Sequence, residues 1–230
     1  MNRNVLKIIA LVSMLIDHIG YYIFDNFVVC RIIGRLAFPI FAFFVAEGMK
    51  YTRNRKKYIL TLLVFAIVSQ IPYALLNKPF KLNILFTFLI AIVFILLFEF
   101  LKREDIKKSL IKSILVTFLI SILFILCLIF GDVLRFIDYA LPGIILIVAF
   151  YFIKSKWKFL VAALLMVVYV LESLLIFEFG WSLFIQLFAI ASILLLLFYN
   201  GNKGKLNLKY LFYVFYPVHL FLIWIIMLIL

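Results

Sequence analysis

The 230-residue chain is 69% hydrophobic and only 14% charged, with a mean hydropathy of +1.28. Soluble domains are about half apolar and about a quarter charged, so this composition excludes an ordinary water-soluble fold and predicts an integral membrane protein. The formal charge of +13 does not indicate a nucleic-acid partner, because the Lys and Arg residues form short clusters between apolar stretches rather than one polar face. We therefore expect membrane lipids, and not nucleic acid, around this chain.

The first apolar stretch contains Asp17 and His18 and lacks a small-residue cleavage site, so we interpret it as a membrane helix rather than a removed signal peptide. Cys30 and Cys127 have neither C-x-x-C spacing nor neighbouring histidines. The sequence therefore predicts no metal site and no disulfide framework.

Nine apolar stretches are long enough to be membrane spans. A helix needs about 20 residues to cross a hydrocarbon core of about 30 Å, and open sheet edges are excluded from lipid. The expected fold class is therefore all-α, a polytopic helical bundle that forms one domain over residues 1–230. The predicted spans are residues 5–24, 31–50, 57–76, 83–101, 109–130, 135–153, 157–176, 181–199 and 209–230.

Clusters of Lys and Arg fall at alternate ends of these spans. The clusters begin at Arg3, Arg53, Lys102, Lys154 and Lys203, whereas the opposite ends carry few positive residues. Positively charged loops face the cytoplasm. The sequence therefore predicts an odd number of spans, with the N-terminus in and the C-terminus out.

Ionisable side chains inside the first two spans are the main functional signal. A charged side chain at the membrane centre costs about 2.5 to 3.5 kcal/mol on insertion scales, so such residues usually pair and serve a pathway or a site. Asp17 and His18 lie in the first span, and Arg31 and Arg35 lie four residues apart on one face of the second. Pro39 follows, and we expect a kink beneath the arginine pair.

Each of these groups has two interpretations. Arg31 and Arg35 either clamp a carboxylate or phosphate ligand or have structural roles. In the structural alternative, Arg31 reaches the outer interface. Arg35 then pairs with Asp17 or Asp138. His18 is either a base that titrates near neutral pH or a buried hydrogen-bonding residue. It lies about 100° from Asp17 around the helix, so we expect its carboxylate partner to come from another span.

Two further pairs involve the second and last spans. Tyr216 and His219 are three residues apart and share a helix face, where they belong either to a site or to packing. Glu47 lies near the cytoplasmic end of the second span, and we expect it to pair with Lys50 or Arg53.

Four motifs resemble the TraX family, in the same order and across nearly the whole chain. They are LKIIALVSMLIDHIG at 6–20, RIIGRLAFPIFAF at 31–43, SQIP at 69–72 and YVFYPVHL at 213–220. The family is named for a membrane protein that acetylates the amino terminus of a conjugative-pilus pilin. It is similar to the wider group of transmembrane acyltransferases that use cytoplasmic acyl-CoA.

The resemblance implies an acetyltransferase of the bacterial cytoplasmic membrane. It would move an acetyl group from acetyl-CoA to an amine or hydroxyl of an acceptor, which is a pilin-like protein, a glycan or a small molecule. The resemblance implies catalytic roles for His18, Asp17 and Arg35 and cofactor-binding roles for Arg31, Glu47 and His219. Tyr216 joins the expected cofactor-binding residues because it shares a helix face with His219. His18 would act as a general base or hold the acetyl group on its imidazole.

Two other classes of function are compatible with the residues. In a transporter, Asp17, His18 and Asp138 would form a proton or substrate pathway. In a noncatalytic membrane assembly factor, substitutions at His18 and Arg35 would harm folding or partner binding rather than turnover. The sequence leaves the acceptor, the preferred acyl chain and the oligomeric state open.

Overall fold

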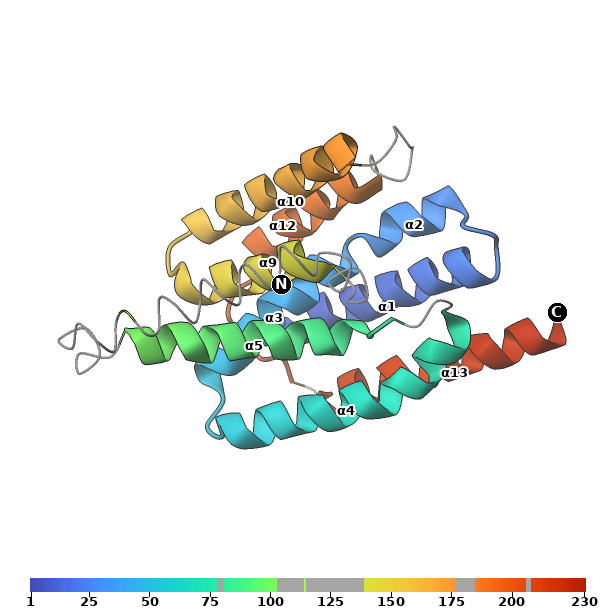
Figure 1. Ribbon diagram of the computed structural model, residues 1–230, viewed down its shortest axis with the longest axis horizontal. Coiled ribbons are helices and arrows are strands. Elements are labelled where there is room, and N and C mark those ends of the chain that lie inside the picture. Colours follow the sequence, from blue (N-terminus) through green and yellow to red (C-terminus); the bar gives the residue numbers. More distant parts are fainter. Residues whose placement is uncertain (78–80, 103–113, 115–138, 177–184, 206–207) are drawn as a thin grey trace.

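The computed structural model describes residues 1–77, 81–102, 114, 139–176, 185–205 and 208–230. Every regular element in these ranges is helical, as the expected all-α class requires, and the long helices run roughly along one axis (Figure 1). The helices are α1 (Arg3–Tyr22), α2 (Val28–Gly34), α3 (Ala37–Tyr51), α4 (Arg55–Leu76), α5 (Ile84–Leu101), α9 (Ala140–Phe152), α10 (Trp157–Ile176), the 3-10 turn η1 (Phe188–Ile190), α12 (Ala191–Leu197) and α13 (Lys209–Ile229).

Five helical stretches of the described residues are long and apolar enough to cross a membrane, with mean hydropathies of 1.5 to 2.9. The second of them combines α2 and α3. All five agree to within a few residues with predicted spans. They are Arg3–Tyr22, Val28–Tyr51, Arg55–Leu76, Ile84–Leu101 and Tyr210–Ile229.

Three shorter apolar helices lie where three more spans are predicted. They are Leu141–Phe152, Trp157–Val168 and Ile185–Leu197, within the predicted spans 135–153, 157–176 and 181–199. The predicted span 109–130, except residue 114, and Asp138 lie outside the described residues. The total of nine spans and the N-in, C-out orientation therefore stay predictions.

Asparagine side chains begin three of the long helices. Asn2, Asn54 and Asn83 each accept a hydrogen bond from a backbone N–H two or three residues further on, at the starts of α1, α4 and α5. The first N–H groups of a helix have no intrahelical partner, so these side chains stabilise the helix ends. Local sequence thus sets where these helices begin.

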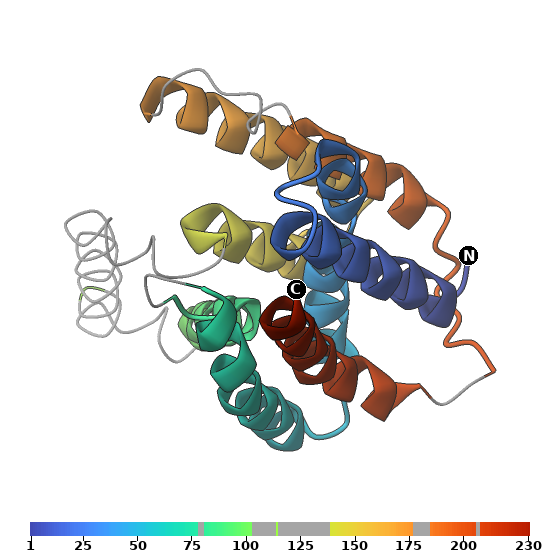
Figure 2. The ribbon, with the colours of Figure 1, turned by 90° about the vertical axis from the view of Figure 1, so that its right-hand side faces the viewer.

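Helix α3 lies at the centre of the bundle. It packs against α1, α4, α5, α9 and α12, and Ile40, Phe43 and Met49 on it are almost fully buried. In the most apolar 18 residues of Val28–Tyr51, 56% of the residues are buried, whereas the corresponding share in the other four long stretches is at most 33%. The end view in Figure 2 shows α1, α13 and α4 side by side around this centre. Side chains of α3 can therefore line a cavity between these helices.

The second span is interrupted at Arg35 and Leu36, between α2 and α3. The expected kink beneath the arginine pair is therefore confirmed in position, as a break between two helices. Pro39 is the third residue of α3, where a missing N–H removes no intrahelical hydrogen bond. The interruption lets the chain change direction at Arg35.

Gly34 lies at a close approach between α2 and α1. A Cβ atom at this position would lie 2.1 Å from Oδ1 and 2.3 Å from Cβ of Asp17. These separations are far below van der Waals contact, so only glycine allows α2 to lie this close to Asp17.

We expect Gly34→Ala to lower the free energy of unfolding by about 1 to 3 kcal/mol, the usual cost of overpacking a fitted interior. The measurement is thermal unfolding of the detergent-purified protein. Ile33→Ala is the control, because Ile33 is the adjacent residue and is 36% exposed. An unchanged melting temperature in the Gly34 variant would contradict the close packing of Gly34 on Asp17.

Candidate active site

A cavity of about 800 Å³ lies between α1, α2, α3, α4, α5 and α13. Helix α1 contributes one continuous stripe to it, formed by Arg3, Lys7, Leu11, Met14 and His18. Successive members of the stripe are three or four residues apart, so they lie on one helix face. The stripe passes from cationic residues at one end, through apolar residues, to a histidine. The two ends of the cavity therefore differ in chemistry, one being cationic and the other carrying an imidazole.

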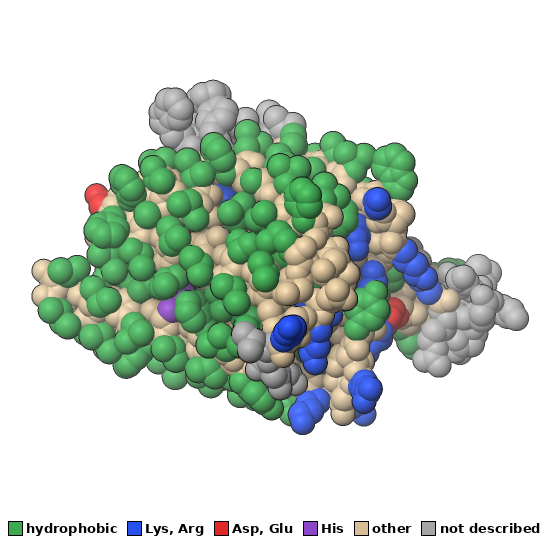
Figure 3. Space-filling view, turned by 180° about the vertical axis from the view of Figure 1, so that it is seen from behind, with side chains coloured by type: hydrophobic (Ala, Val, Ile, Leu, Met, Phe, Trp, Pro, Cys, Tyr) green, Lys and Arg blue, Asp and Glu red, His purple; other side chains and the backbone are tan. Residues whose placement is uncertain are grey.

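One end of the cavity is strongly basic. It is lined by Arg3, Lys7, Arg53, Lys57 and Lys203, and Figure 3 shows Lys and Arg side chains gathered at one end of the molecule. Hydrophobic side chains cover most of the remaining visible face. We call this end the basic mouth.

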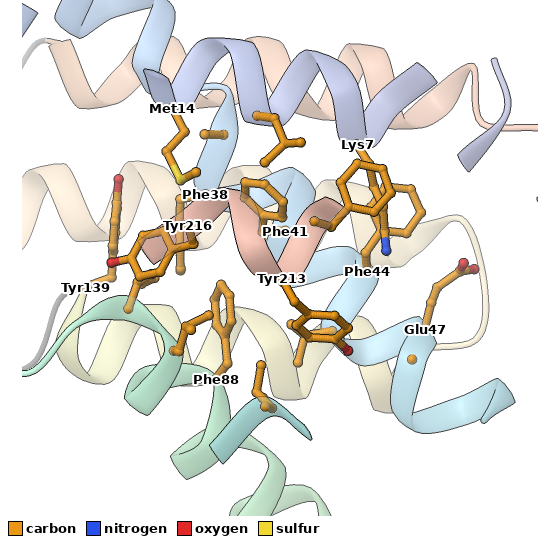
Figure 4. Close-up of a pocket in the computed structure, with 18 of the residues that line it drawn as sticks. Lys7, Met14, Phe38, Phe41, Phe44, Glu47, Phe88, Tyr139, Tyr213 and Tyr216 are labelled. Atoms are coloured by element: carbon orange, nitrogen blue, oxygen red, sulfur yellow. The ribbon is translucent and has the colours of Figure 1, made fainter. Parts of the chain in front are cut away.

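Aromatic side chains form the middle of the cavity. Figure 4 shows Phe41 and Phe44 from α3, Phe88 from α5, and Tyr213 and Tyr216 from α13 around the open space. Tyr216, which the sequence points to as a site residue, is therefore a lining residue of the cavity. This middle section suits a ligand that is mainly apolar and uncharged.

At the deep end, opposite the basic mouth, His18 of α1 lines the cavity. It is hydrogen-bonded to His219 of α13, which is buried behind it and is not itself a lining residue. Nδ1 of His18 lies 2.7 Å from Nε2 of His219. The ring planes differ by 4° and the ring centroids are 5.0 Å apart. This separation exceeds the N–N distance by about two ring radii, so the rings lie edge to edge in nearly one plane. The contact is thus a well-directed hydrogen bond.

The protonation pattern of the pair follows from a third group. Nδ1 of His219 lies 2.8 Å from the backbone oxygen of Phe215. A carbonyl oxygen only accepts, so this Nδ1 carries the proton, and Nε2 of a neutral His219 accepts. His18 then donates from Nδ1 and keeps the lone pair of its Nε2. The partner of His18 comes from another helix, as expected, but it is an imidazole and not the expected carboxylate.

Asp17 binds both arginines of the second span. Oδ2 of Asp17 accepts a hydrogen bond of 2.7 Å from Arg31, and Oδ1 accepts one of 2.7 Å from Arg35. Arg35 is only 6% exposed, and it also donates to Gln186 (3.2 Å) and to the Arg31 carbonyl (3.1 Å). The guanidinium of Arg31 lies 4.6 Å from the ring centroid of Tyr21. The expected pairing of Arg35 with Asp17 is therefore confirmed, and Arg31 binds the same carboxylate.

This ion cluster has an excess of one positive charge, because one carboxylate meets two guanidinium groups. Asp17 and His18 are sequence neighbours, so the excess charge lies beside the histidine pair. All four of Asp17, His18, Arg31 and Arg35 line the deep end of the cavity. Such fixed positive charge can stabilise an oxyanion that forms nearby.

Glu47 lies at the other end, near the basic mouth. Its Oε2 is 3.5 Å from Nη2 of Arg3 and accepts a hydrogen bond of 3.0 Å from the Tyr199 hydroxyl. A carboxylate oxygen only accepts, so the Tyr199 hydroxyl donates this hydrogen bond. The expected pairing of Glu47 with Lys50 or Arg53 was wrong.

Several residues near the cavity had no role in the sequence interpretation. The Tyr22 hydroxyl donates to Oδ1 of Asn77 at 3.0 Å, and both residues line the cavity. Gln186 holds Arg35, and Lys7 belongs to the basic cluster beginning at Arg3, which the sequence marks only as a topology signal. The three- and four-residue spacing of the α1 stripe is the sequence pattern that could have identified Lys7 as a lining residue.

The helices have the length and composition of a helical membrane protein, and its interior holds a cavity, a histidine pair and an arginine–aspartate cluster. A family model described as TraX protein matches residues 2–227, and the chain belongs to this family. The probable fimbrial assembly protein FimC, serogroup H1, of Dichelobacter nodosus is 28% identical over 97% of each chain. An uncharacterized protein of Rickettsia prowazekii (strain Madrid E) is 35% identical over 34% of this chain and 29% of its own. No solved structure matches the chain.

Proposed function

We propose that this TraX-family protein is a membrane acetyltransferase, which moves an acetyl group from cytoplasmic acetyl-CoA to an amine or hydroxyl of an acceptor at or across the membrane. The observation that carries the proposal is the cavity that joins the basic mouth to the histidine pair. The proposed N-in, C-out orientation, with nine spans, would place the basic mouth on the cytoplasmic side.

The cavity suits an acyl-CoA in both charge and length. Anionic phosphates favour the basic mouth, and the mostly uncharged pantetheine arm favours the aromatic middle. Lys7 and His18 are eleven residues apart, which is about 17 Å along a helix. Arg31 and Arg35 lie at the deep end and already hold Asp17. We therefore assign them to the thioester carbonyl and not to the phosphates.

The proposed reaction needs one base and one oxyanion stabiliser. Nε2 of His18 takes the proton of the acceptor amine or hydroxyl as that atom attacks the thioester carbon. The carbonyl oxygen becomes an oxyanion beside the arginine cluster. When the carbon–sulfur bond breaks, His18 returns the proton to the CoA thiolate. The products are the acetylated acceptor and free CoA thiol.

His219 is the positioning residue for this base in the proposal. Its Nε2 accepts from Nδ1 of His18, which keeps the His18 lone pair on Nε2. When His18 is protonated, the same hydrogen bond spreads the positive charge toward His219. If the acetyl group is instead held on His18, the same nitrogen is the nucleophile.

The test measures free CoA thiol released from acetyl-CoA by the purified protein in lipid nanodiscs, with and without an acceptor. The name of the D. nodosus relative makes a pilin-like protein the first acceptor to test. Release that needs acceptor and disappears in a folded His18 variant would support acetyl transfer. Flux of a solute or proton without acetylated product would support a transporter, and neither activity would support an assembly role.

We expect His219→Ala to lower kcat about tenfold or more and to shift the pH dependence of kcat, because His18 loses the acceptor that orients its ring. His219→Gln offers an amide oxygen in place of Nε2 and should recover most of the activity. The measurement is a pH–rate profile of all three proteins. Equal kcat and an unchanged profile in the alanine variant would contradict the positioning role.

A further inference from the structure

Lys7 lies one helical turn deeper than Arg3 in the basic mouth. Its ammonium lies 4.8 Å from the ring centroid of Phe212 on α13 and 5.4 Å from that of Phe44 on α3. The faces of two aromatic rings attract a cation and limit where it can move. Figure 4 shows the Lys7 side chain extending from α1 into the space beside Phe44. The ammonium is thus held at a defined place in the cavity.

The charge of Lys7 has no ion-pair partner in the part of the chain that the structure describes. Glu47 lines the same end of the cavity, but its carboxylate is bound by Arg3 and Tyr199. Nε of Arg3 is also buried without a hydrogen-bond partner among the described residues. An ammonium held between two aromatic rings without an ion-pair partner, beside a buried Nε that makes no hydrogen bond, favours the binding of an anionic ligand at this place.

The position of Lys7 along α1 indicates which class of anion would bind there. Lys7 and His18 line the same stripe, about 17 Å apart along the helix. The pantetheine arm between a thioester and the first phosphate of CoA is equivalent to roughly four or five extended residues, about 15 Å. An acyl-CoA with its carbonyl at His18 would therefore bring its pyrophosphate to Lys7.

We infer that Lys7, with Arg3 beside it, forms the pyrophosphate subsite of the acyl-CoA donor and sets the distance from that group to His18. This inference rests on the proposed function, because the reacting end of the ligand is placed at His18. An ammonium offers three N–H donors, which suits a pyrophosphate with several acceptor oxygens. The remaining basic residues of the mouth then face the nucleotide end.

The experiment compares CoA with acetyl-pantetheine, which lacks the phosphates, as ligands of the full chain in nanodiscs of zwitterionic lipid. Isothermal titration calorimetry measures Kd without requiring turnover. In Lys7→Met, we expect the Kd of CoA to rise about tenfold or more, the effect of losing a charged hydrogen bond. The Kd of acetyl-pantetheine should change less than about twofold, because that ligand does not reach Lys7.

Two variants serve as controls. Lys56→Met removes one positive charge from the start of α4, where Lys56 is exposed and does not line the cavity. It should leave the Kd of CoA within about twofold of the wild-type value, because an exposed charge is screened by salt. Lys7→Arg keeps the charge and should lose much less affinity for CoA than Lys7→Met. If Lys7→Met does not fold, Lys7→Gln replaces it, and thermal unfolding checks both.

Three outcomes would overturn the inference. Unchanged CoA affinity in the Lys7→Met variant would show that Lys7 does not contact the phosphates. An equal loss of affinity for CoA and for acetyl-pantetheine would indicate a structural role for Lys7. A Lys7 effect that is seen only when anionic phosphatidylglycerol is added to the discs would assign the residue to a lipid phosphate instead. If the proposed function itself is wrong, the result is distinguishable from these three, because the wild-type protein would then bind neither CoA nor acetyl-pantetheine.

Discussion

Replacing His18 with alanine is expected to reduce acetyl transfer by about 10²- to 10⁴-fold, the range that a general base contributes. The loss should appear in kcat, because the proton is removed only as the acceptor attacks the thioester. The affinity for acetyl-CoA should change little, since the phosphates and the pantetheine arm contact other parts of the cavity. The measurements are CoA thiol release and mass spectrometry of the acceptor.

Met14→Leu is the matched control for the His18 variant. Met14 lies on the same stripe of α1 and lines the same cavity, but it carries no titratable group. Exchange of Met for Leu conserves volume and usually costs less than about 1.5 kcal/mol. Activity should therefore stay near the wild-type value. Full turnover by a folded His18→Ala protein would rule out the proposed mechanism.

Replacing Asp17 with alanine should produce the largest loss of stability, about 3 to 5 kcal/mol. Asp17 is 9% exposed and is the carboxylate that binds both Arg31 and Arg35. Without it, two guanidinium groups lie close together in a poorly hydrated interior, and their mutual repulsion adds to the lost contacts. Thermal unfolding in detergent, followed by circular dichroism, measures the effect.

A double variant separates lost pairing from lost packing. Asp17→Ala combined with Arg35→Met removes both partners of one ion pair, which is usually less destabilising than removing one partner. We therefore expect the double variant to be more stable than Asp17→Ala alone. Asp25→Asn is the control, because Asp25 is exposed in the turn after α1 and asparagine also tolerates its positive φ of 46°. A melting temperature of Asp17→Ala equal to that of the wild type would show that the cluster contributes nothing to stability.

Contacts between residues of different helices could not be predicted from the sequence when the residues lie far apart in the chain. Arg31 and Arg35 are close to Asp17 in sequence, and Asp17 was among the predicted partners of Arg35. The partner of His18 is 201 residues away, and Arg3 and Glu47 are 44 residues apart. The local sequence around these residues does not indicate which helix faces will pack against each other. The Glu47 prediction failed because it considered only the sequence neighbours Lys50 and Arg53, whereas Arg3 and Tyr199 come from distant parts of the chain.

Hydropathy and motif order by themselves determined the membrane class, the TraX family and the approximate bounds of the five long helices, because these properties depend on residues close together in the chain. Only the tertiary structure decided that α1 and α13 join His18 to His219, that Asp17 binds both arginines, and that Lys7 faces a cavity instead of serving only as a topology signal. Contacts of this kind depend on how helices rotate and pack against one another, and an apolar sequence pattern leaves many such arrangements open.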